Sequence, residues 1–304
     1  MDVVTGAFGY IGKYIAKALI EDGRTVRTIT THPNKPNPFG ASVRAFAYNF
    51  DNPDALVQTL DGADTLYNTY WIRFPFDGQT YEQALENTWT LFECAREAGV
   101  KRIVHIGVTR ASLDSDLPYY RGKAAQESML AESGVPFSIV RPTLVFGRED
   151  ILVNNIAWLI RKSPVFPIFG SGRYRVQPVF FEDLAHIAVW QPASPAGATI
   201  DAIGPETYTF EEFIKLIAEK IGRHPGFVRV PPGLGIFCGQ VLSIFLKDVL
   251  LTRNELKGLM DEMLTSEQMP NGPTKFSDWL ETNKETIGAS YSSEVGRHFR
   301  WSAY

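Results

Sequence analysis

The sequence has very little cysteine: Cys94 and Cys238 are its two cysteines in 304 residues. Two cysteines do not form a disulfide framework, which fits a reducing compartment, so we predict a cytoplasmic protein. Each is more simply explained as a small buried apolar residue. No group of histidines and cysteines has the spacing of metal ligands, and no metal site is expected.

Long apolar runs are also lacking. Residues 231–251 (PPGLGIFCGQVLSIFLKDVLL) come closest, but Gly, Gln, Lys and Asp interrupt them, so no integral membrane segment is predicted. A core or interface helix is the simpler interpretation, and docking on a membrane surface is the alternative. We expect no secretory signal, because a β-rich run begins at residue 2. The net charge of −4 gives no reason to expect nucleic acid as a partner.

What the chain does have is a glycine loop at its start. Within residues 1–12 (MDVVTGAFGYIG), a β-rich run leads into Gly6, Gly9 and Gly12, and apolar residues at helical spacing follow over 11–20. Glycines permit the tight turn and the close approach of a pyrophosphate, and the helix N-terminus supplies N–H groups and a positive dipole. The motif predicts a ligand that carries phosphate. A glycine-rich turn without a ligand is the alternative.

Strand-like and helix-like segments alternate through the first half of the chain. This alternation predicts an α/β fold: a doubly wound parallel sheet with right-handed crossovers, of the Rossmann type. We expect 1–146 to form the NAD(P)-binding domain, with 178–200 returning to it, and 147–304 to form a smaller, mostly helical substrate domain. The predicted strands are 2–4, 24–31, 43–48, 65–70, 102–107 and 135–140, and the predicted helices of this half are 11–20, 54–60, 81–98 and 118–130.

The second strand ends without a carboxylate. In folds specific for NAD, an Asp or Glu at this point binds the ribose hydroxyls. Here the chain has Thr30, Thr31 and His32, with Arg27 and Lys35 nearby. Nothing in this stretch repels a 2′-phosphate, so we favour NADP as the cofactor, with NAD as the alternative. Arg27 and Lys35 are otherwise solvated surface charges.

Tyr119 and Lys123 are four residues apart in a helical segment, so they share one face of that helix. An ammonium beside a phenol favours the phenolate and lowers the pKa of the tyrosine, which makes it a usable acid or base near neutral pH. Thr109 follows the strand 102–107 and can hydrogen-bond a substrate carbonyl or hydroxyl. The spacing is common by chance, and a partly buried tyrosine beside a surface lysine is the alternative.

Tyr70, Trp71 and Arg73 stand at the carboxyl end of the strand 65–70, where open α/β sheets bind ligands. An arginine between aromatic rings can hold an anionic or aromatic substrate. Aromatic residues that merely cover the edge of the sheet are an equally weighted alternative. The histidines His105, His186 and His224 are more simply structural or surface residues.

Several short motifs, in this order, resemble the short-chain dehydrogenase/reductase superfamily in its extended or atypical branch. The resemblance covers residues 1 to about 210. It implies that Tyr119 donates or accepts a proton, that Lys123 also holds the nicotinamide ribose, and that Thr109 polarises the reacting oxygen. The matching stretches are TGAFGYIG (5–12), Asn49–Phe50, Asn87, Thr109, Tyr119 with Lys123, RPTLVFG (141–147) and QPVFFEDLA (177–185).

The resemblance also implies which residues bind the two ligands. Family members often dimerise through helices that match 81–98 and 119–130, so a homodimer is expected. The cofactor is expected to contact Gly6, Phe8, Gly9, Tyr10, Ile11, Gly12, Thr31, His32, Asn49, Phe50, Thr69, Lys123, Pro142, Thr143 and Val145. The substrate is expected to contact Tyr70, Trp71, Arg73, Asn154, Trp158, Arg173 and a helix within 231–250.

Two departures from the pattern of sugar-nucleotide epimerases narrow the class of substrate. Sugar-nucleotide epimerases have a longer loop before the catalytic tyrosine and an Arg where this chain has Val176, so a sugar nucleotide is disfavoured. We therefore predict an NAD(P)-dependent oxidoreductase or redox epimerase that transfers hydride to or from a small or apolar carbonyl or alcohol. The alternative is a non-catalytic NADP(H)-binding subunit or redox sensor, because 65–71 and 177–185 look like the atypical branch that includes the nucleotide-binding accessory subunit of respiratory complex I.

Overall fold

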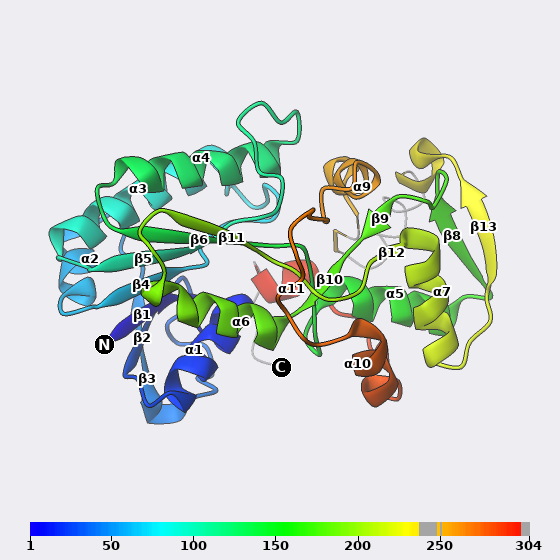
Figure 1. Ribbon diagram of the computed structural model, residues 1–304, viewed down its shortest axis with the longest axis horizontal. Coiled ribbons are helices and arrows are strands. Elements are labelled where there is room, and N and C mark those ends of the chain that lie inside the picture. Colours follow the sequence, from blue (N-terminus) through cyan, green and yellow to red (C-terminus); the bar gives the residue numbers. More distant parts are fainter. Residues whose placement is uncertain (237–247, 250, 299–304) are drawn as a thin grey trace. The chain divides into compact units, whose positions relative to one another are not determined.

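The computed structural model describes residues 1–236, 248–249 and 251–298, which belong to two compact units (Figure 1). The first unit comprises Met1–Pro142 and Phe181–Ala202, and the second comprises Thr143–Phe180 and Ile203–Tyr304. The chain therefore passes between the units after Pro142, Phe180 and Ala202. Each unit has a hydrophobic core of its own.

A seven-stranded sheet forms the centre of the first unit, and all of its neighbouring strands are parallel (Figure 1). The strand order is β11-β6-β5-β4-β1-β2-β3, so the order reverses beside β1, where open α/β sheets bind ligands. The predicted doubly wound α/β fold is confirmed. The strands are β1 (Asp2–Thr5), β2 (Val26–Thr30), β3 (Val43–Ala47), β4 (Thr65–Asn68), β5 (Arg102–Ile106), β6 (Phe137–Pro142) and β11 (Ala198–Ala202).

Helices cover both faces of this sheet (Figure 1). Because both faces are covered, the central strands are largely buried, and all four residues of β1 are buried. One face carries α1 (Ile11–Glu21) and α6 (Phe181–Trp190), which pack together, and the other carries α2 (Pro53–Leu60), α3 (Tyr81–Glu97) and α4 (Pro118–Glu132). Short 3-10 helices span Gly40–Ser42 and Gln191–Ala193.

The second unit combines helices with three two-stranded sheets. Its core includes Phe146, Phe213 and Phe276, and the ring of Phe276 contacts the rings of the other two. The predicted helical C-terminal region is confirmed, but the small sheets were not predicted. The strands β9 and β12 have only two residues each, and the sequence of β8 (VFPIF) contains no polar residue that alternates with its apolar ones. The strand pairs are β7 (Leu144–Phe146) with β10 (Pro178–Phe180), β8 (Val165–Phe169) with β13 (Gly226–Val230), and β9 (Arg175–Val176) with β12 (Tyr208–Thr209). The helices are α5 (Ile151–Lys162), α7 (Phe210–Lys220), α9 (Arg253–Met260), α10 (Phe276–Asn283) and α11 (Glu294–His298).

The apolar stretch 231–251 lies largely outside the described residues, because 237–247 and 250 are not among them. The interpretations of this stretch as a helix, a substrate wall or a membrane-docking surface therefore stay predictions. Within the described ranges, no helix is both long and apolar enough to cross a bilayer. The same ranges contain no group of three or more His, Cys, Asp and Glu side chains that could ligate a metal ion.

Candidate cofactor and catalytic site

The glycine loop joins β1 to α1 and is shaped by glycine at two points. Gly6 has a φ of +66°, a conformation that side chains disfavour. A Cβ atom on Gly12 would lie only 2.6 Å from the Gly6 carbonyl oxygen and 2.7 Å from that of Thr5. The loop is also tied to β2, because the Ala7 N–H donates to Thr28 Oγ1 at 2.9 Å and Thr28 donates to the Val4 carbonyl at 2.8 Å. Glycine at these two positions therefore permits the tight turn, and the Thr28 hydrogen bonds hold the loop against the sheet.

The helix that follows starts without a side-chain cap. Tyr10 is the N-cap residue of α1, and its side chain makes no capping hydrogen bond to this helix terminus. The ring of Phe181 fixes the first turn, with its centroid 3.9 Å from that of Tyr10 and 5.0 Å from that of Tyr14. A glycine cradle before an uncapped helix N-terminus favours a bound phosphate. These residues therefore fit a dinucleotide cofactor.

Thr69 closes the other side of the loop, directly after β4. Its N–H donates to Thr5 Oγ1 at 2.7 Å, and its hydroxyl donates to the Thr5 carbonyl at 2.6 Å. A Cβ on Gly6 would stand 3.6 Å from Thr69 Oγ1, so Thr69 lies against the loop. These hydrogen bonds connect the carboxyl ends of β1 and β4 at the position where the strand order reverses.

An aromatic cluster follows β3. Asn49 has a φ of +50°, which asparagine tolerates better than most residues, and it turns the chain into Phe50. The Phe50 ring centroid lies 4.8 Å from that of Tyr48 and 5.3 Å from that of Tyr70. Asn87 donates to the Tyr70 hydroxyl at 2.8 Å. Tyr70, which we expected at the substrate, therefore packs with the residues expected at the cofactor.

At the second strand, Arg27 has a structural contact. Its guanidinium donates to the carbonyl oxygens of Thr59 at 3.2 Å and Asp61 at 3.3 Å, at the end of α2. The cation that we counted in favour of NADP thus satisfies helix carbonyls. Thr31 is exposed and His32 half-buried in the loop after β2.

Of the predicted catalytic residues, Thr109 follows β5, and Tyr119 and Lys123 lie on α4. Lys123 is only 4% exposed, and its Nζ donates to the Ile106 carbonyl oxygen at 2.8 Å. Burial lowers the pKa of Lys123 to about 7, against the opposing effect of the Glu127 carboxylate. Thr109 is buried, and its N–H donates to the Pro142 carbonyl at 3.2 Å. Tyr119 lies one turn before Lys123 on α4, as its spacing predicts.

Trp71 lies against this helix, between the tyrosine and the lysine. Its ring centroid is 6.4 Å from that of Tyr119 and 5.6 Å from Lys123 Nζ, and its indole stacks on Tyr81 at 5.5 Å. A Cβ on Gly122 would come within 2.5 Å of the indole, so the absence of a side chain at Gly122 admits it. The structure thus brings Trp71, Tyr119 and Lys123 together.

An ion pair supports α4 below the catalytic residues. The Glu127 carboxylate binds the Arg141 guanidinium of β6, with 2.9 Å between Arg141 Nε and Glu127 Oε1, and Glu127 is buried. A Cβ on Gly107 would lie 2.6 Å from the same carboxylate oxygen. Sequence reasoning missed Glu127. The available signal was its place four residues after Lys123, on the same helix face.

His105 has a structural environment. It is fully buried in β5, and Asn68 Nδ2 donates to its Nδ1 at 3.0 Å. Burial, followed by the nearby Lys123 and Arg141 charges, holds the pKa of His105 well below its usual value. This environment favours the neutral imidazole, and the hydrogen bond to Asn68 gives the ring a structural role.

Of the predicted residues that remain, Arg73 follows β4 and Pro142 ends β6 in the first unit, and the others fall in the second unit. Thr143 and Val145 are in or next to β7, and Asn154 and Trp158 share one face of α5. The Asn154 side chain is used internally: it donates to the carbonyls of Arg148 and Asp150 and accepts from the Gly288 N–H. The Trp158 ring packs edge-on against Tyr291 at 5.3 Å. Arg173 is exposed before β9.

The fold and these side chains define a class. A Rossmann sheet with a glycine loop before its first helix, and with threonine, tyrosine and lysine after β5 and on α4, is typical of the extended short-chain dehydrogenases and reductases. The chain belongs to the NAD-dependent epimerase/dehydratase family, whose model matches residues 3–199.

Three individual proteins illustrate the range of relatives. The chain is 23% identical to NADH dehydrogenase [ubiquinone] 1 alpha subcomplex subunit 9, mitochondrial, of Arabidopsis thaliana, over 97% of this chain and 82% of that protein. It is 25% identical to the ceramide reductase of Caulobacter vibrioides, over 76% of this chain and 74% of that one. Its fold matches the NADPH-dependent quinone oxidoreductase of Escherichia coli, solved with NADPH, with a TM-score of 0.76 at 19% identity, covering 94% and 99% of the two chains. These matches support NAD(P) binding and leave the preferred cofactor, the substrate and the cellular location as predictions.

Proposed function

We propose that the protein is an NAD(P)-dependent oxidoreductase that reduces a small or apolar carbonyl compound, or oxidises the matching alcohol. The observation that carries the proposal is the presence of Thr109 just after β5 together with Tyr119 and Lys123 one turn apart on α4. A nicotinamide cofactor, when bound, supplies or accepts the hydride. NADP is the cofactor we favour, because no carboxylate ends β2.

Each residue of the set has one task in this proposal. The Tyr119 hydroxyl gives a proton to the substrate oxygen during reduction and takes it back during oxidation. The Thr109 hydroxyl hydrogen-bonds the same oxygen and orients it. Lys123 in its ammonium form favours the phenolate of Tyr119. The glycine loop and Thr69 hold the pyrophosphate region of the cofactor.

The substrate is expected to be apolar, because the side chain beside the catalytic pair is Trp71. Its indole places a largely apolar side chain next to Tyr119 and carries no charge to bind an ionised group. The relatives agree in part: one is named as a reductase of ceramide, and one solved neighbour is named as a quinone oxidoreductase. A flat or lipid-like carbonyl is therefore the first class to test.

The test is replacement of Tyr119 by Phe, assayed against a panel of aldehydes, ketones and quinones with NADPH and NADH. Loss of the general acid should lower kcat about 10²- to 10⁴-fold. Binding of NADPH, followed by its fluorescence, should be unchanged. Tyr120→Phe, on the neighbouring buried tyrosine, is the matched control and should keep full turnover. Unchanged turnover in Tyr119→Phe would exclude this mechanism.

A second candidate is a non-catalytic NADP(H)-binding subunit. It is favoured by the similarity to the Arabidopsis protein, whose name makes it a subunit of an NADH dehydrogenase and which aligns along nearly the whole chain. In this case NADPH binds stoichiometrically and is not oxidised by any member of the panel. Rapid oxidation by one member removes this candidate. The predicted homodimer is tested in the same preparations by light scattering.

A further inference from the structure

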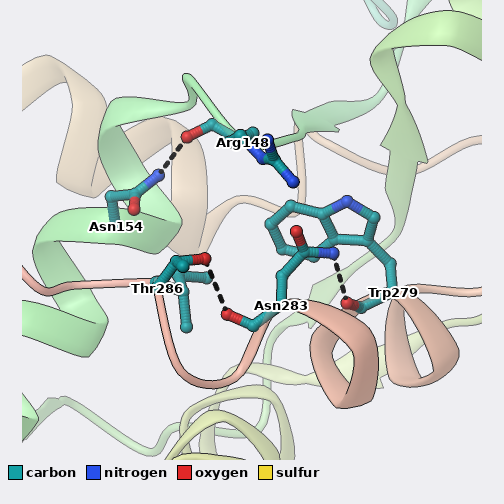
Figure 2. A pocket seen from close by; sticks show the side chains of 6 residues that line it. Arg148, Asn154, Trp279, Asn283 and Thr286 are labelled. Carbon is teal, nitrogen blue, oxygen red and sulfur yellow. Dashed lines mark hydrogen bonds between the residues drawn. The ribbon is translucent and has the colours of Figure 1, made fainter.

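A pocket lies within the second unit, whereas the predicted catalytic residues belong to the first. Its empty volume, which includes the open solvent at its mouth, is about 230 Å³. Its walls come from the loop between β7 and α5, from the first turn of α5, from α10 and from the turn after α10 (Figure 2). The lining residues are Arg148, Asn154, Trp279, Asn283, Thr286 and Ile287.

Internal hydrogen bonds hold these walls in place. Asn154 binds the carbonyls of Arg148 and Asp150 at 3.2 and 2.6 Å and accepts from the Gly288 N–H at 3.2 Å, so it joins α5 to the turn after α10. Arg161 donates to the carbonyls of Ile287 at 3.0 Å and Lys284 at 2.5 Å. The pocket is therefore formed by the protein itself and does not need a ligand to shape it.

The guanidinium of Arg148 differs from the hydrogen-bonded side chains around it. Within the described ranges it makes no hydrogen bond and no ion pair, and it is exposed, whereas Arg161 across the same junction uses its guanidinium on two carbonyls. The loop that carries Arg148 is held by other groups: its carbonyl by Asn154, and the Glu149 carbonyl by Arg297. In Figure 2 the guanidinium extends toward the indole of Trp279 and the side-chain amide of Asn283. Within the described residues, the charge of Arg148 is therefore not used in a contact that stabilises the fold.

The lining has a clear chemical preference. A guanidinium presents a planar fork of N–H donors that matches a carboxylate or phosphate, and it binds such groups more strongly than neutral ones. The indole of Trp279 and the side chain of Ile287 offer apolar contact beside it. We propose that this pocket binds an oxyanion, a carboxylate or a phosphate monoester, carried on a small apolar or aromatic body. The proposal does not depend on the catalytic activity.

The test is fluorine NMR on the full chain labelled with 5-fluorotryptophan. The resonance of Trp279 is assigned by its loss in Trp279→Phe. Benzoate, phenyl phosphate, inorganic phosphate and the neutral benzamide are then titrated to about 10 mM, since a millimolar Kd corresponds to about 4 kcal/mol. We expect a saturable shift of the Trp279 signal with benzoate or phenyl phosphate, and whichever binds tighter identifies the anion. Benzamide should give none.

The arginine is tested with matched variants. Because a hydrogen bond to a charged group contributes about 1.5 to 3 kcal/mol, Arg148→Met should weaken the Kd about 10- to 100-fold. Arg223→Met, which removes an exposed arginine of the same unit outside the pocket, should leave it unchanged. If Arg148→Met does not fold, Arg148→Lys, which keeps the charge and loses the fork, should still weaken it. Equal shifts with benzamide, unchanged affinity in a folded Arg148 variant, or no saturable shift with any anion would overturn the proposal.

Discussion

Lys123 combines burial with a charge that the proposed chemistry requires. Its single described hydrogen bond, to the Ile106 carbonyl, suits an amine as well as an ammonium, and the nearest acidic group, Glu127, is already paired with Arg141. The ammonium is therefore desolvated without full compensation, which is why its pKa falls. The unfavourable desolvation of this ammonium occurs at the position where proton transfer is proposed.

This cost makes stability depend on pH in a defined direction. The pKa of Lys123 is about 7 in the folded protein and near 10.5 in the unfolded chain, so between these values the unfolded chain binds the additional proton. The free energy of unfolding should then rise with pH, by up to about 1.4 kcal/mol per unit. Relative to Lys123→Met, the wild-type protein should gain about 2 kcal/mol between pH 7 and pH 9 in urea unfolding.

The control for this measurement is Lys162→Met, at the exposed end of α5. Its free energy of unfolding should differ from wild type by the same amount at both pH values. A difference between wild type and Lys123→Met that does not change with pH would show that Lys123 is charged in the folded protein throughout this range.

Among single residues, local spacings could be predicted from the sequence, whereas tertiary contacts could not. The spacing of Tyr119 and Lys123 predicts their shared helix face, because helical periodicity is local. The contact of Trp71 with both residues could not be predicted, since it depends on the absence of a side chain at Gly122, which is distant from Trp71 in the sequence. The contact of Arg27 with the end of α2 is likewise a tertiary contact, and no local pattern distinguishes it from a cofactor contact.

At the scale of elements, the close approach of α1 to β1 rests on Gly12. A methyl group there would meet two backbone carbonyl oxygens at 2.6 and 2.7 Å, and neither can move without breaking the turn. Gly12→Ala should lower the free energy of unfolding by about 1 to 3 kcal/mol and weaken the binding of NADPH, because the helix N-terminus is displaced. Thermal unfolding and a fluorescence titration measure the two effects.

Gly233→Ala is the matched substitution, since a Cβ there meets nothing within 4 Å. It should leave NADPH binding unchanged and stability equal or slightly higher. Unaltered stability and binding in Gly12→Ala would mean that the helix can shift at no cost.

The elements also show why the fold was more predictable than its details. The strands and helices of the first unit are long and regular enough to show their period in the sequence, and the alternation of strand and helix then determines a parallel sheet. The strands β9 and β12 have two residues each, too few for any period, and their pairing is set by tertiary packing.

At the scale of the whole molecule, the three passages of the chain between the units separate the predicted cofactor contacts. The glycine loop, the residues after β3 and the catalytic set belong to the first unit, whereas Thr143 and Val145 belong to the second. The core of the second unit, around Phe213, contains none of the predicted contacts. A bound cofactor should therefore stabilise the two units unequally.

Hydrogen exchange with NADPH and with NADH measures this difference. A ligand at about 100 times its Kd adds about 2.7 kcal/mol to the stability of what it binds, so exchange in peptides of β1, the glycine loop and β5 should slow by up to about 100-fold. Peptides of α7 should change little, and those of β7 should slow only if Thr143 and Val145 contact the cofactor. NADPH should protect at lower concentration than NADH, because no carboxylate stands at the end of β2 to repel a 2′-phosphate. Stronger protection by NADH would reject the NADP preference, and equal slowing of α7 would show that the two units open as one.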